Sequence, residues 1–332
     1  MTIYSNISEI DLSQWTNLVH GSSTASFFQT PECYDFYASL GFMNAFVYGV
    51  SENDKLVGLM CGYVISDGNA AKRFFSKRAI VPGGLLLDME ISALAIQKLL
   101  ECAAADLQSR AIYIEIRNYK DYGVYRPAIQ SAGFNYLPHL NIHVPTPDIA
   151  TAMSGMHASR RRQLKAAQRL GVTWSETTDV TDIRAFYDCL LHIYTTKVKT
   201  SLFPIEFFEK LVGLKNGKLL VVKHNEEVIG GMACVILPDN TLYEWFVCGE
   251  ETGEKGYYPS VMATWAGMEC AILQNIPRFD FMGAGKPDEG YGVRDFKSKF
   301  GGEIVEHGRF LYICKPKLFK LGKWMVGRMK NQ

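Results

Sequence analysis

The chain has 332 residues, of which 48% are apolar and 21% are charged, so it can form a packed core and is not a mainly disordered protein. Its 35 Lys and Arg residues are balanced by 34 Asp and Glu residues, which excludes a protein whose whole surface binds nucleic acid and makes any charge-based function local. No stretch approaches the ~18 uncharged apolar residues that cross a bilayer, and the first residues lack the pattern of a secretory signal. We therefore expect a cytoplasmic protein, and the length predicts two domains.

Two segments, 45–66 and 218–237, share the pattern of an apolar run, a polar turn and a second apolar run, which predicts an antiparallel hairpin in each. Val50 aligns with Val222 at an offset of 172 residues, and the same offset matches an asparagine, a glycine and a methionine. A predicted helix and a further strand follow each hairpin. The predicted helices are 91–108 and 259–274, and the predicted strands are 111–117 and 278–284.

This repeated order predicts a mixed α/β fold of two similar units, which we interpret as an internal duplication. The same order of elements also recurs in unrelated α/β proteins, and this is the alternative. The expected domains are residues 1–150 and residues 151–314, followed by a tail at 315–332.

A helix predicted between the two units carries the most basic internal segment of the chain. Residues 157–169 contain five positive charges and no negative charge. Guanidinium groups pair with phosphate oxygens through two parallel hydrogen bonds, so this helix favours a phosphate or diphosphate ligand, and a solvated surface is the alternative. The candidate phosphate-binding residues are Arg160, Arg161, Arg162 and Lys165.

A stretch rich in glycine, 249–265, leads into the second predicted helix. Backbone N–H groups at a helix N-terminus favour an anionic ligand or a developing oxyanion. The stretch resembles only loosely the glycine-spaced pyrophosphate loop of acetyltransferases, and an ordinary connecting loop is the alternative. Its candidate donor-binding residues are Lys255, Gly256, Tyr257 and Ser260.

A strand, a glycine-rich loop and a second glycine pair follow one another in the segment 279–313. Arg294, Lys297 and Lys299 lie between the two glycine-rich parts. A lysine here is suited to bind a phosphate or to stabilise a carbonyl oxyanion as it forms. A flexible loop without such a role is the alternative.

Four segments together resemble the Fem family of peptidoglycan-bridge aminoacyltransferases and the related acetyltransferases of the GNAT superfamily. They are FFQTPECYDFY at 27–37, VPGGLLLD at 81–88, SRRRQLKAAQRLGV at 159–172, and FDFMGAG together with DFKSKFGGE. Their order and spacing carry the resemblance, which extends over about residues 25–313. It implies a fold of two GNAT-like units, in agreement with the duplication inferred above.

The resemblance also implies transfer of an acyl or aminoacyl group to a primary amine of a nucleotide- or lipid-linked precursor of peptidoglycan or surface polysaccharide. By position in the motifs, Arg161 holds a diphosphate, Lys297 supports the transfer and Asp88 is a carboxylate on the substrate side. An attacking amine must be neutral, so Asp88 is the first candidate base and Glu244, in the otherwise apolar segment LYEWFVCG, is the second, unless water takes the proton. For Lys297→Ala we expect a strong loss of turnover at a nearly unchanged melting temperature.

Two other functions stay open from the sequence. One is an acyl-CoA-dependent N-acyltransferase acting on an amino sugar, and the other is a non-catalytic module that binds a nucleotide-sugar or RNA. We expect no permanently bound cofactor, and the acyl donor is either aminoacyl-tRNA or acyl-CoA. The eight cysteines contain no CxxC pair, so we expect reduced thiols and no metal ion.

The tail at 315–332 contains six basic residues and no acidic residue, with apolar residues at helical spacing. One interpretation is a cationic amphipathic helix on an anionic membrane surface, which would place the protein peripherally on the inner face of the membrane. The other is a terminal helix packed on the protein body. The first interpretation suits a lipid-linked acceptor.

Overall fold

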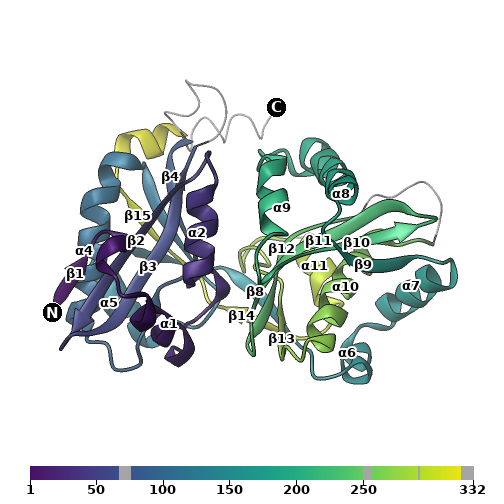
Figure 1. Cartoon of the computed structure of the whole chain (residues 1–332), viewed down its shortest axis with the longest axis horizontal. Helices are drawn as coiled ribbons and strands as arrows, with labels where there is room; N and C mark the ends of the chain where they lie inside the picture. Colours follow the sequence, from purple (N-terminus) through teal and green to yellow (C-terminus); the bar gives the residue numbers. More distant parts are fainter. Residues whose placement is uncertain (67–75, 250–255, 291, 323–332) are drawn as a thin grey trace. The chain divides into compact units, whose positions relative to one another are not determined.

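The computed structural model describes residues 1–66, 76–249, 256–290 and 292–322 (Figure 1). They form two compact units: unit 1 is Met1–His139 together with the chain from Glu306, and unit 2 is Leu140–Val305. Each unit is a mixed, mostly antiparallel sheet with helices packed on it, as the sequence predicts. Lys255 and the end of the tail, 323–332, lie outside the described residues.

The sheet of unit 1 has the strand order β1-β2-β3-β4-β6-β15-β7 within the described residues, and β5 pairs with β3. Neighbouring strands are antiparallel except β4 and β6, which are parallel. The strands are β1 (Thr2–Tyr4), β2 (Asn44–Glu52), β3 (Lys55–Ile65), β4 (Arg78–Gly83), β5 (Leu86–Leu87), β6 (Tyr113–Asn118), β7 (Asn135–Leu137) and β15 (Arg309–Ile313).

Strands β2 and β3 are buried along nearly their whole length, because helices cover both faces of the sheet there. Helix α4 lies on one face and α2 on the other (Figure 1), and Leu99 and Leu100 of α4 join the core beneath it. Among the described residues of unit 1 before the tail, the α-helices are α1 (Leu12–Gly21), α2 (Pro31–Ser39), α4 (Ala93–Arg110) and α5 (Arg126–Ser131).

The sheet of unit 2 has the order β14-β8-β13-β12-β11-β10-β9, with β12 and β13 parallel. Its strands are β8 (Leu140–Pro145), β9 (Thr173–Thr177), β10 (Gly217–His224), β11 (Glu227–Leu237), β12 (Thr241–Gly249), β13 (Arg278–Asp280) and β14 (Glu303–Glu306). Its helices are α6 (Ile149–Gly155), α7 (Ala158–Arg169), α8 (Val180–Ile193), α9 (Ile205–Leu211), α10 (Pro259–Leu273) and α11 (Gly292–Ser298). The buried helix α10 packs on β10, β11 and β12, and α8 lies on the opposite face of these strands (Figure 1).

The two central hairpins, β2–β3 and β10–β11, repeat each other in detail, which supports the duplication. Each turn has two central residues with positive φ, Asn53 at 49° and Asp54 at 63° in unit 1, and their counterparts at 47° and 67° in unit 2. A register shift follows Val50 in the first hairpin and Val222 in the second. Turn and bulge therefore recur at the offset of 172 residues that the sequence alignment gave.

Each unit contains one strand from the part of the sequence that was expected to belong to the other unit. The boundaries therefore fall at 139/140 and 305/306, and not at the expected 150/151 and 314/315. Strand β8 follows unit 1 in sequence but pairs with β13 of unit 2, where Val144 lies opposite Phe279. Strand β15 follows unit 2 in sequence but pairs with β6 of unit 1, where Phe310 lies opposite Ile116. For both β8 and β15, hydrogen bonding to a strand distant in sequence decides which unit the strand belongs to.

The described start of the tail is helical at 316–322 and packs on unit 1. The ring of Phe319 lies 5.5 Å from that of Tyr113, and Lys315 Nζ donates to Ser109 O at 3.4 Å. In the part of the chain that the structure describes, no helix has the length and apolar character needed to cross a membrane. All eight cysteines are free, and six of them are buried.

Candidate active site

The parallel strands β12 and β13 of unit 2 separate after a short paired stretch. They pair only at Leu242 with Phe279 and at Tyr243 with Asp280. The next residue of β12 is Glu244, and a bulge in the β11–β12 ladder follows, because Ala233 lies opposite residue 246 while its neighbour lies opposite residue 244. Beyond this point the two strands leave room for a side chain from another element.

The side chain of Lys297, from α11, enters between the separating strands. Its Nζ lies 3.1 Å from Glu244 Oε1 and donates to the backbone oxygens of Phe281 at 2.8 Å and Gly283 at 3.1 Å. These three acceptors use all three hydrogens of the ammonium group. The side chain of Glu244 is 3% exposed, and its Oε2 is buried with no hydrogen-bond partner among the described residues.

The environment of Glu244 favours the uptake of a proton. Burial raises the pKa of Glu244 because the charged carboxylate loses its hydration, Lys297 opposes this rise, and the nearby Asp280 adds to it. The unpartnered Oε2 is the oxygen at which a proton can arrive, since Lys297 occupies Oε1. A buried carboxylate with a raised pKa beside a lysine is suited to general base catalysis.

Arg160 holds the basic helix α7 against α11. Its guanidinium lies 4.2 Å from the ring centroid of Phe296 and 5.4 Å from that of Phe300, and Nη2 donates to Phe296 O at 3.4 Å. Arg160 is buried, and burial lowers its pKa. The two segments that the sequence singled out, the arginine helix and the Lys297 segment, are therefore brought together, and Arg160 makes the contact.

The remaining basic residues of α7 have different surroundings. Arg161 donates from Nη1 to the backbone oxygens of Ser154 at 3.2 Å and of Met156, at the C-terminal end of α6. Arg162 and Lys165 are exposed, and no ion pair joins either of them to another described residue. Arg161 therefore caps a helix in this structure, while Arg162 and Lys165 face solvent.

Of the expected donor-binding residues, those that the structure describes lie before α10 or in its first turn. Gly256 has φ 113°, and a Cβ there would lie 2.9 Å from a methyl carbon of Leu170 in the residue after α7. The ring of Tyr257 contacts that of His224, with centroids 4.2 Å apart and the ring planes tilted by 34°, and Ser260 Oγ donates to Gly249 O at 3.3 Å. Gly256 thus packs against the residue that follows α7, Tyr257 packs against the end of β10, and the hydroxyl group of Ser260 is already used within the fold.

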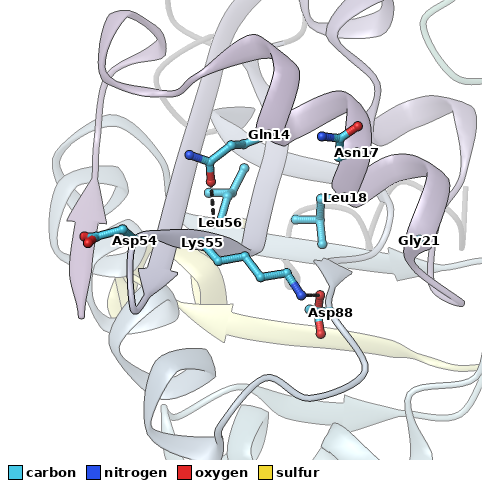
Figure 2. A pocket seen from close by; sticks show the side chains of 8 residues that line it. All are labelled: Gln14, Asn17, Leu18, Gly21, Asp54, Lys55, Leu56 and Asp88. Atoms are coloured by element: carbon cyan, nitrogen blue, oxygen red, sulfur yellow. Dashed lines mark hydrogen bonds and ion pairs between the residues drawn. The ribbon is translucent and has the colours of Figure 1, made fainter.

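Asp88 belongs to unit 1 and lines a cavity of about 370 Å³ (Figure 2). Lys55 extends along this cavity from the β2–β3 turn, and its Nζ lies 2.7 Å from Asp88 Oδ2, while Gln14 and Asn17 line the same cavity from α1. Burial alone would raise the pKa of Asp88, but the hydrogen bonds from Lys55 and from the amide of Glu90 lower it.

In unit 1 the corresponding pair of parallel strands, β4 and β6, does not separate. There β4 and β6 pair without a gap over six residues, from Arg78 opposite Tyr113 to Gly83 opposite Asn118. Beyond the pairing, the hydroxyl group of Tyr122 donates to Leu85 O at 2.5 Å. The duplication therefore yields one opened pair of parallel strands, in unit 2, and one sealed pair, in unit 1.

Comparison with known proteins finds one matching domain and several similar folds. Residues 155–298, which include Glu244 and Lys297, match the family described as acetyltransferase (GNAT) domain. The whole fold is similar to FemX, with 13% identity, a TM-score of 0.72, and coverage of 97% of this chain and 99% of FemX. It is also similar to L-PGS from Bacillus licheniformis (13% identity, TM-score 0.57, coverage of 94% and 96%) and to a tandem GNAT protein from the clavulanic acid biosynthesis pathway (12%, 0.57, coverage of 94% and 98%). The search of curated protein sequences found no match.

Residues 155–298 therefore match an acetyltransferase domain of the GNAT type, and the two-unit fold of the whole chain is similar to that of FemX.

Proposed function

We propose that the protein transfers an acyl or aminoacyl group to a primary amine of a nucleotide- or lipid-linked cell-envelope precursor, and that the reaction takes place in unit 2 where β12 and β13 separate. The observation that carries this proposal is the buried, unpartnered Oε2 of Glu244 beside Lys297. The C-terminal domain of the Agrobacterium fabrum protein named as a lysylphosphatidylglycerol synthetase, a second similar fold at TM-score 0.59, supports a lipid-linked acceptor by its name. The amine as the attacking group rests on the resemblance of the sequence motifs to the Fem family.

In the proposed reaction Glu244 acts as the general base and Lys297 keeps it oriented. The acceptor amine attacks the acyl carbon of the donor, its excess proton passes to Glu244 Oε2, and the carrier leaves with the electron pair of the broken ester or thioester bond. Lys297 holds Oε1, so that Oε2 is the oxygen that meets the amine. Asp88 has no part in these steps, because its carboxylate is paired with Lys55 and its pKa is lowered.

Two carriers are candidates for the donor. Aminoacyl-tRNA is supported by the resemblance of the sequence motifs to the Fem aminoacyltransferases, and acyl-CoA is supported by the acetyltransferase domain at 155–298 and by the similar tandem GNAT protein. Arg162 and Lys165 are exposed cations and remain candidate contacts for the phosphates of either carrier or of a nucleotide-linked acceptor.

The test is transfer of radiolabel from [¹⁴C]acetyl-CoA, and separately from tRNA charged with a ¹⁴C-amino acid mixture, to a UDP-linked muropeptide and to a UDP-linked amino sugar. We expect one donor to label one acceptor, and we expect Glu244→Gln to reduce the rate about 100-fold because a general base contributes 10²- to 10⁴-fold. Asp88→Asn is the matched control, and its rate should stay near that of the wild type. Full activity of Glu244→Gln, or loss of activity in Asp88→Asn alone, would contradict the assigned base.

A further inference from the structure

The two carbonyl groups that bind Lys297 belong to a turn with an unusual backbone. The turn follows β13, and its residues Met282 and Gly283 have φ values of 57° and 146°. A residue with a side chain rarely adopts positive φ because its Cβ crowds the backbone there, so the conformation of Met282 must be held by its surroundings. Phe281 O and Gly283 O flank this residue, and their directions depend on it.

The side chain of Asp280 stabilises this turn through hydrogen bonds. Its Oδ1 accepts hydrogen bonds from the amide of Met282 at 2.6 Å and from Nδ2 of Asn141 at 2.7 Å. Its Oδ2 lies 3.1 Å from Nε2 of His143. Asp280 is 1% exposed, so this carboxylate depends on these partners in place of water.

Asn141 and His143 come from β8, the strand exchanged between the units. They are two residues apart and therefore lie on the same face of the strand, and His143 is directly opposite Asp280 in the ladder. Asn141 Nδ2 also lies 3.3 Å from His143 Nε2, so the three side chains form one connected group. The backbone pairing of β8 continues past the turn, because the amide of Ala284 donates to Leu140 O at 2.8 Å.

We propose that Asp280, Asn141 and His143 are positioning residues for Lys297: they fix the turn after β13, the turn fixes the two carbonyl groups that bind Nζ, and Nζ fixes Glu244. The reaction-centre role of Lys297 and Glu244 rests on the proposed function. The position and hydrogen bonding of the Lys297 ammonium group can be measured without substrate.

The direct test is NMR of the full chain with ¹⁵N-labelled lysine side chains. A buried ammonium group with three acceptors exchanges its hydrogens slowly and gives its own signal, which Lys297→Arg identifies by its loss. We expect this signal to disappear in Asn141→Ala and in Asp280→Ala. It should persist in Asp280→Asn, whose side-chain oxygen can still accept from the amide of Met282.

Thr146→Val is the matched control. Thr146 directly follows β8, is buried, and donates to Ile276 O at 2.6 Å, so this variant also loses one buried hydrogen bond of the same segment but does not touch the turn. The Lys297 signal should persist in Thr146→Val at a melting temperature similar to that of Asn141→Ala. A signal that persists in Asn141→Ala, or one that is lost equally in Thr146→Val, would overturn the positioning role.

Activity separates this inference from the proposed function. With the donor and acceptor that show transfer, we expect Asn141→Ala to lower kcat by about 10- to 100-fold with little change in KM, since a displacement of about 1 Å can cost 100-fold. Thr146→Val should retain the kcat of the wild type. If the NMR result is as expected but Lys297→Ala retains full activity, the proposed function fails and the positioning of the ammonium group stands.

Discussion

Replacement of Lys297 by Met tests the electrostatic coupling at the centre of the site. Methionine fills a similar volume but donates no hydrogen bond, so Glu244 loses its counter-ion while the core stays filled. Removal of one partner from a buried ion pair costs about 3 to 5 kcal/mol, because the other charge stays buried and unpaired. Unit 2 comprises residues 140–305, and for a unit of this size such a loss lowers the melting temperature by roughly 10 °C.

The loss should depend on pH in a defined direction. In the folded protein the pKa of Glu244 is raised above its ordinary 4.5, so the folded state binds the extra proton and this group lowers stability as the pH rises from 4.5 through the raised pKa. Lys297 opposes the rise, and without it the pKa of Glu244 moves higher. The deficit of Lys297→Met relative to the wild type should therefore be small near pH 4.5 and largest at higher pH.

The measurement is urea unfolding at pH 5, 6, 7 and 8, followed by a probe in unit 2. The double variant Lys297→Met/Glu244→Gln should recover most of the lost stability at pH 8, because it removes the unpaired charge. Lys286→Met is the control, since Lys286 pairs with Glu289 at 2.6 Å on the exposed surface and its loss should cost under about 1 kcal/mol. An equal deficit of Lys297→Met at pH 5 and pH 8 would refute the coupling.

Two further predictions concern other charged groups. Arg160→Ala should destabilise unit 2 by about 2 kcal/mol, because it removes a buried guanidinium stacked on Phe296, whereas the exposed Arg162→Ala should change stability by under about 0.5 kcal/mol in the same denaturant titration. In unit 1, burial opposes the charge of Glu115 but Arg117 and Arg309 outweigh it and lower its pKa from 4.5 to about 2. This lowering of the Glu115 pKa corresponds to about 3 kcal/mol of folding stability, which is present above pH 4.5 and is lost as the pH falls toward 2. Calorimetry should show this acid-dependent loss in the wild type and not in Glu115→Gln.

The structure also changes one expectation for Lys297. The sequence places this residue between two glycine-rich parts of the segment 279–313 and predicts little effect of its replacement on the melting temperature. In the fold its side chain is 13% exposed and makes three polar contacts. A replacement should therefore affect stability as well as turnover, and the double variant described above separates the two effects.

Some features of the molecule follow from the sequence alone. The hairpins, the helix after each hairpin and the duplication follow from local hydrophobic periodicity and turn residues. These signals act within about twenty residues of chain, so they can be recognised in the sequence alone. Lys297 and Glu244 were already candidate residues from the sequence, one from its motif and the other as the single charge in an apolar strand, and the structure brings the two side chains together. Asp280 stood within the recognised FDFMGAG motif, but nothing in its neighbourhood indicated what it holds.

Other features were decided only by the tertiary structure. The exchange of β8 and β15 depends on hydrogen bonds between segments far apart in sequence, and no local pattern specifies which sheet a strand joins. The parallel strands separate in unit 2 and stay paired in unit 1, although both pairs come from the same repeated order of elements. Register and bulges, and not composition, therefore distinguish the two pairs. Whether a charged side chain pairs, caps a helix or faces solvent depends on which neighbours the folded chain brings within a few ångströms, and that is why Arg160 and Arg161, adjacent in sequence, have different partners.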